Sequence, residues 1–194
     1  MKFALVFVIV LILIQGVSAL SVNLKNMYAS EETMIAEVEG VLLQPIQTNQ
    51  IEFKRNNVII PLEFEIKTLG ESTFLWAIAP RNENNYTLSL KEVVVRENGE
   101  QRTMSYEKNF SVISNHTLYN VRPGAISSKK DFQIEITSFA DEEIKISSNF
   151  PNEEQLLLKP GKNTFTFPVN SVEGTKLIAI KLGNYILPAY LTGS

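Results

Sequence analysis

Apolar and polar residues alternate along much of the chain. Between Phe132 and Thr137, the apolar residues Phe132, Ile134 and Ile136 are separated by polar ones. The same period of two recurs in residues 60–67, 74–78, 86–91, 144–146, 165–167 and 178–182. Because successive side chains of a strand point to opposite faces, this pattern predicts half-buried strands in antiparallel sheets.

Turn-forming pairs separate these runs, among them Asn56-Asn57, Asn98-Gly99 and Pro160-Gly161. Short strands at a spacing of about 8–12 residues predict an all-β sandwich or barrel. Residues 30–42 are ambiguous. Ser30 is a possible helix cap, with Met34, Val38, Val41 and Leu42 on one helical face, while Met34, Ala36 and Val38 also alternate as in a strand. We favour the strand because its surroundings are strand-like.

The polar residues 114–117 divide the chain into two parts of similar size. We predict a first sandwich at 20–113, a connector at 114–117 and a second sandwich at 118–194, with limited proteolysis cutting first in the connector. A turn followed by Tyr and by Leu two positions later occurs in both parts, at Tyr86-Leu88 and Tyr185-Leu187. This echo is weak evidence of repetition.

The N-terminus carries an export signal. Lys2 precedes twelve residues without a polar side chain, Phe3 to Ile14, and small residues follow at Val17-Ser18-Ala19. This organisation is typical of a secretory signal peptide over residues 1–19, cleaved after Ala19. The alternative is an uncleaved membrane anchor, since no charge occurs from Phe3 to Leu24. We therefore expect a secreted or cell-surface protein, membrane-bound only if this segment is retained.

Composition excludes several chemistries. The 194 residues include 18 Lys and Arg and 21 Asp and Glu, so the net charge is −3. This charge disfavours a nucleic-acid partner, because phosphate binding needs clustered positive charge. With no Cys and one His, the chain lacks thiolate metal sites and thiol nucleophiles, and most zinc and triad designs are excluded. The absence of Cys from an exported protein also favours a prokaryotic source.

Few residues remain as candidates for a reaction. His116 falls in the polar connector, and Ser127-x-x-Lys130 lacks the partner motifs of serine acyltransferases. The acidic groups at 141–143 and 153–154 fit solvated turns better than calcium loops. We therefore predict no catalytic, cofactor-binding or metal-binding residues, no cofactor and no enzymatic activity.

Surface features are also few. Three glycosylation sequons begin at Asn85, Asn109 and Asn115; only Asn115 lies in the expected connector, and it is the glycosylation candidate. We expect strand pairing to hide the other two. Trp76 shares a face with Phe74 and Ile78, and we expect it in the core of the first sandwich. An exposed stacking platform for sugars is the alternative.

Several features of the sequence support a family resemblance. They are the signal peptide, the absence of Cys, the strands rich in Ile, Asn, Lys and Glu, and the segments Asn85–Leu88 and Lys108–Val112. The chain resembles tandem immunoglobulin-like (fibronectin-III-like) β-sandwich modules of secreted or surface proteins of prokaryotes, archaea more than bacteria. The resemblance implies two immunoglobulin-like sandwiches with a non-catalytic role as spacer, adhesin or envelope component. The two Cys that bracket a Trp in immunoglobulins are absent, which leaves only the wider architecture.

We therefore expect a non-enzymatic module that contacts protein or glycan at the cell surface. One alternative is a periplasmic or surface assembly chaperone that binds clients by adding a strand to an open sheet edge. It requires an unprotected edge, whereas the strand expected at Ile60–Lys67 carries Pro61 and alternating charges. A secreted all-β hydrolase is a further alternative.

Overall fold

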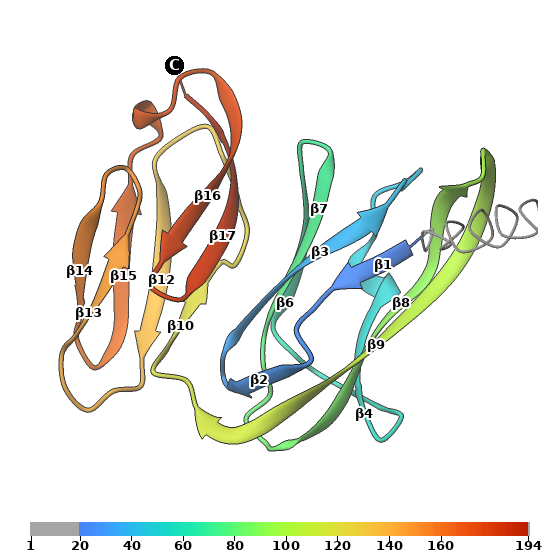
Figure 1. The fold of residues 1–194 in the computed structure, drawn as a ribbon, viewed down its shortest axis with the longest axis horizontal. Helices are drawn as coiled ribbons and strands as arrows, with labels where there is room; N and C mark the ends of the chain where they lie inside the picture. Colours follow the sequence, from blue (N-terminus) through green and yellow to red (C-terminus); the bar gives the residue numbers. More distant parts are fainter. Residues whose placement is uncertain (1–19, 194) are drawn as a thin grey trace, which may run out of the picture.

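The computed structural model describes residues 20–193, and their regular structure is almost entirely β-strand (Figure 1). Two short 3-10 segments, η1 (Thr48–Gln50) and η2 (Val169–Ser171), are the other regular elements of this part of the chain. Within residues 20–193, no helix has the length and apolar character needed to cross a bilayer. The predicted signal peptide and the cleavage after Ala19 lie outside the described residues.

The first sandwich packs a four-stranded sheet against a five-stranded sheet. The four-stranded sheet has the order β1 (Leu20–Asn23), β3 (Thr33–Gly40), β7 (Ser72–Ile78), β6 (Phe64–Leu69). The five-stranded sheet has the order β2 (Met27–Ser30), β9 (Glu100–His116), β8 (Asn84–Glu97), β4 (Ile51–Arg55), β5 (Val58–Ile60). One buried apolar cluster, which includes Phe53, Leu75, Leu88 and Phe110, fills the space between them.

The second sandwich is built in the same way, with one strand fewer. Its smaller sheet has the order β10 (Tyr119–Arg122), β12 (Phe132–Ser138), β15 (Gly161–Phe167). Its larger sheet has the order β11 (Ile126–Ser128), β17 (Tyr185–Thr192), β16 (Thr175–Leu182), β13 (Ile144–Ser148), β14 (Glu154–Leu158). Ile134, Ile136, Leu158 and Ile180 belong to its separate core.

Strand order identifies the fold. In each sandwich a short strand pairs in parallel with the last strand, β2 with β9 and β11 with β17, and the other pairs are antiparallel. The strands are distributed between the two sheets in the order of the immunoglobulin fold. The chain is thus all-β, with two consecutive immunoglobulin-like sandwiches, as predicted. The burial of Phe132, Ile134 and Ile136 in β12 shows why alternation was informative.

The structure settles one ambiguous segment and corrects one predicted strand. The chain forms β2 and β3 on either side of Glu31 and Glu32, so the strand favoured for residues 30–42 is confirmed. The single strand expected over Ile60–Lys67 is wrong, because the segment contains the end of β5 and the start of β6, which belong to different sheets. Pro61 lies in the crossing between sheets, where its missing N–H costs no ladder hydrogen bond.

The repeated Tyr motif does not mark equivalent positions. Tyr86 lies at the start of β8, and its hydroxyl donates to the Asn82 carbonyl at 2.7 Å, as in the tyrosine corner of immunoglobulin-like domains. Tyr185 instead begins β17, the counterpart of β9, and its hydroxyl donates to the Tyr119 carbonyl at 3.0 Å. The echo therefore reflects a common turn sequence and no structural repeat.

The residues predicted as a connector mostly belong to a strand. β9 continues through Ser114, Asn115 and His116, and His116 is opposite Ser30 of β2. The backbone N–H of Thr117 donates to the Ser30 carbonyl at 3.3 Å. The domain boundaries at 113 and 118 stay predictions, to be tested by limited proteolysis.

Candidate functional site

A third apolar cluster lies between the two sandwiches. Its buried members Leu69, Trp76 and Ile78 come from the outward face of the first sandwich, and Ala125 comes from the second. Trp76 is only 5% exposed. The expected placement of Trp76 in the first core is therefore wrong: Leu75 and Ala77 occupy that core, and Trp76 faces the opposite way. Its burial also removes the sugar-stacking alternative.

The approach of the two sandwiches at this cluster is very close. A Cβ atom added at Gly124 would lie 2.6 Å from the Trp76 Cβ and 3.2 Å from the Ile35 Cγ1. The indole Nε1 of Trp76 donates to the Glu65 Oε2 at 3.1 Å, which satisfies its polar atom. Glycine at position 124 is thus what allows the second sandwich to sit against the indole.

Hydrogen bonds between the sandwiches surround this apolar contact. The Thr33 hydroxyl donates to the Val121 carbonyl at 2.9 Å and accepts from the Val121 N–H at 2.8 Å. The Asn120 amide donates to the Glu31 carbonyl at 3.2 Å. Because Thr33 and Asn120 are buried, these bonds satisfy the Thr33 hydroxyl and the Asn120 amide N–H, whereas the buried Asn120 Oδ1 has no hydrogen-bond partner among the described residues.

Two tyrosines and two ion-pairing side chains complete the junction. The Thr33 N–H donates to the Tyr185 hydroxyl at 3.4 Å. Burial raises the pKa of Tyr119 and of Tyr185, so both phenols stay neutral hydrogen-bonding groups near neutral pH. Arg122 and Glu63 form an ion pair of 3.1 Å across the junction.

An apolar groove extends from the junction toward solvent. Its volume is about 560 Å³, and its walls include Ile35 and Phe74 from one sandwich and Leu177, Ile186 and Pro188 from the other. Ile35 and Phe74 also pack against the junction cluster, so groove and cluster are continuous. Figure 1 shows β16 and β17 on the side of the second sandwich that is turned toward β6 and β7.

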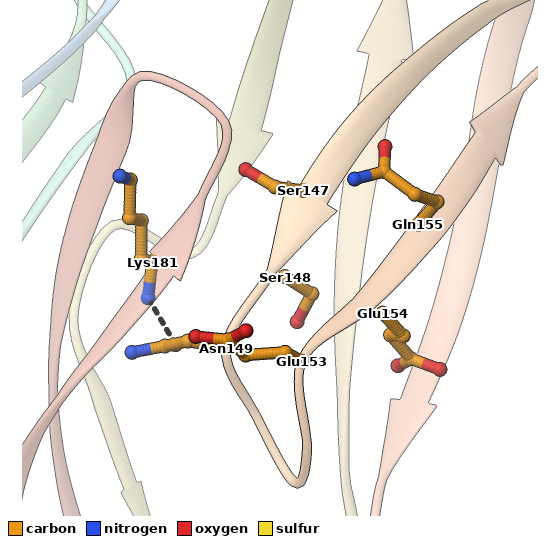
Figure 2. Close-up of a pocket in the computed structure, with 7 residues that line it drawn as sticks. All are labelled: Ser147, Ser148, Asn149, Glu153, Glu154, Gln155 and Lys181. Atoms are coloured by element: carbon orange, nitrogen blue, oxygen red, sulfur yellow. Dashed lines mark hydrogen bonds between the residues drawn. The ribbon is translucent and has the colours of Figure 1, made fainter.

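A second open pocket, of about 580 Å³, lies at the turn between β13 and β14 (Figure 2). It is lined by polar residues, and the Lys181 N–H donates to the Asn149 Oδ1 at 2.7 Å. Glu153 and Glu154 are exposed there, as a solvated turn requires. Figure 2 shows the Ser147, Ser148, Glu154 and Gln155 side chains pointing in different directions.

The other sequence-derived candidates are not brought together. His116 lies at the end of β9, and Ser128 uses its hydroxyl to donate to the Lys130 carbonyl at 2.6 Å. In residues 20–193, no three His, Cys, Asp or Glu side chains gather as metal ligands would. Asn115 is exposed, and its glycosylation stays a prediction.

The expectation that strand pairing hides Asn85 and Asn109 is wrong, because both are exposed. Their sequons lie opposite each other on β8 and β9. The Ser111 hydroxyl donates to the Asn85 Oδ1 at 2.7 Å, and the Thr87 hydroxyl donates to the Asn109 Oδ1 at 2.8 Å. Pairing occupies the backbone of the strands, whereas these side chains project from the outer face of the sheet.

The sequence analysis did not predict the junction, although the sequence contains a signal for it. Residues 74–79 form an uninterrupted apolar run, Phe-Leu-Trp-Ala-Ile-Ala. Such a run is typical of a strand that is covered on both faces. The alternation of Phe74, Trp76 and Ile78 predicts burial of only one face of this strand. The apolar residues between them show that its other face is buried as well.

No protein-family model matches the sequence, and no curated protein sequence matches it. Among solved structures, the chain aligns with the I9–I11 tandem from titin at 13% identity, covering 90% of this chain and 65% of that one, with a TM-score of 0.27. It aligns with a chimeric titin Z1Z2 functionalised with a KLER exogenous peptide from decorin at 10% identity, covering 91% and 98%, with a TM-score of 0.25. Scores this low carry no argument, so the immunoglobulin-like assignment depends on the strand order described above.

Proposed function

We propose that the protein is a non-enzymatic module that holds its two sandwiches at a fixed angle and works as a spacer, adhesin or envelope component. The observation that carries this proposal is the buried junction around Trp76. Two domains in one chain move relative to each other by default, unless the interface between them is extensive and apolar. Burial of Leu69, Trp76, Ile78 and Ala125 supplies that restraint.

Export and prokaryotic origin belong to the same proposal. The apolar segment before Ala19 supports secretion or display at the cell surface, and the absence of Cys supports a prokaryotic source. The expected partners are proteins or glycans of the envelope, because the net charge of −3 disfavours polyanions.

Retention of envelope components tests the contact role. A pull-down with the purified protein, paired with a glycan array, is expected to retain a specific partner. Trp76→Ala is expected to let the angle between the sandwiches vary. It should therefore weaken the binding of a partner that contacts both sandwiches more than the binding of a partner that contacts only one. The non-enzymatic proposal would be contradicted if the protein turned over an ester, peptide or glycoside. This activity would have to persist after the protein is repurified and disappear when a single Glu is changed to Gln.

A further inference from the structure

The second sandwich has one open side. In the first sandwich, β6 lies between β5 and β7 in sequence and borders β7 in the sheet. In the second, only Lys159 and Pro160 connect β14 to β15. Within the described residues, the sheet β10-β12-β15 therefore ends at β15, where the counterpart of β6 would otherwise pair. β14 is likewise the last strand of its own sheet, so both layers end on this side.

β15 lacks the usual protection of an edge strand. It runs for seven residues, Gly161–Phe167, in an unbroken register with β12 and without Pro. Its only charged residue is Lys162, which forms an ion pair with Glu135 of β12 and has a side chain that is 66% exposed. Edge strands normally avoid pairing by means of Pro, bulges, charged side chains or short length, and a single paired Lys is the one such device in β15. β12 pairs with one side of β15, so the backbone groups on the other side can pair with a further strand, although the Gly161 carbonyl already accepts from the Asn163 amide at 3.0 Å.

We propose that β15 pairs with β15 of a second copy of this chain, antiparallel and about a two-fold axis at Thr164. Thr164 is the central residue of β15, so an axis at this position gives all seven residues a partner. Lys162 then faces Thr166, Asn163 faces Phe165 and Thr164 faces its own copy. The two three-stranded sheets become one continuous sheet, closed by symmetry into a dimer.

Charge and side-chain chemistry favour a second copy as the occupant. Like charges that face each other across two strands are destabilising, and this register opposes none. It places Thr beside Thr, which is a favourable cross-strand pair.

Charge-swap variants test this pairing. In sedimentation equilibrium from about 1 μM to about 1 mM, the purified protein is expected to show a dimer. Thr164→Lys alone and Thr164→Glu alone each place like charges across the axis and should weaken the dimer at least tenfold. Mixing the two variants places Lys opposite Glu and should restore the dimer. Thr175→Lys, at a position of β16 that is also exposed, should leave the dimer unchanged.

Several results would overturn the pairing: a single-chain mass over the whole concentration range, unaltered dimers of both Thr164 variants, or a mixture that stays monomeric. A monomer that binds an unrelated extended peptide at β15 would also overturn it, and would favour addition of a client strand instead. Pairing through β15 is independent of the proposed spacer role. Trp76→Ala, which releases the junction, should leave this dimer intact, so failure of one proposal is distinguishable from failure of the other.

Discussion

The strands β7 and β8 belong to the same sandwich but differ in how many faces they bury. In β8, Tyr86, Leu88 and Leu90 face the core, while Asn85 and Thr87 face outward with polar side chains. In β7 the outward positions are occupied by Phe74, Trp76 and Ile78, which pack toward the second sandwich. An alternating strand thus marks a surface in water, and a continuously apolar strand marks a surface covered by another part of the chain.

The largest expected effect comes from removing the outward indole of β7. Trp76→Ala should lower the free energy of unfolding by about 3–5 kcal/mol, since it leaves a cavity where the sandwiches meet. Denaturant unfolding followed by circular dichroism measures the change. The matched control is Thr87→Ala on the outward face of β8, expected to stay within about 0.5 kcal/mol. Similar losses for both variants would contradict the difference between the strands.

The opposite change, adding an atom to the junction, should cost less. Gly124→Ala places a methyl group 2.6 Å from the Trp76 Cβ, so the second sandwich must shift away. We expect a loss of about 1–3 kcal/mol together with a wider angle between the sandwiches. Small-angle scattering measures the angle, and a profile identical to that of the unaltered protein would show that Gly124 does not set it.

Tyr185→Phe should remove about 1–1.5 kcal/mol, because the hydroxyl that reaches the Tyr119 carbonyl at 3.0 Å is lost. The pH dependence sharpens this test. Burial raises the pKa of Tyr185 in the folded state, so its contribution is complete below the unfolded value of about 10 and is lost as pH rises above it. Stability measured from pH 8 to 11.5 should fall less steeply at high pH in Tyr185→Phe. An equally steep fall in Tyr185→Phe and in the unaltered protein would show that Tyr185 does not cause the loss of stability at high pH.

The smallest effect is expected at the rim of the junction. Glu63→Gln breaks the 3.1 Å ion pair with Arg122, and both groups are partly exposed to water. The loss should not exceed about 1 kcal/mol and should shrink in 1 M salt, where charges are screened within about 3 Å. A larger loss that is independent of salt would point to packing in place of charge.

Much of the fold was predictable because each sandwich is organised by local alternation. Phe132, Ile134 and Ile136 indicated their strand and its buried face correctly. The sequence was less informative where a strand changes sheet, as at Pro61, or where a face is covered by a distant segment, as at Trp76. Gly124 and Ala125 are far from Trp76 along the chain, and no local pattern connects them. The open edge at β15 arises because Lys159 and Pro160 alone connect β14 to β15, which leaves no strand between them. The sequence alone does not show this, because the missing strand is recognised only from the strand order.

The central claim, a fixed angle between the sandwiches, is tested most directly by a distance distribution between spin labels. The chain has no native Cys, so labels attach only to Cys introduced at exposed Glu100 in the first sandwich and exposed Asp141 in the second. Double electron–electron resonance should give one narrow distribution for the otherwise unaltered protein and a markedly broader one after Trp76→Ala. A broad distribution in the unaltered protein, or one that Trp76→Ala leaves unchanged, would contradict the account.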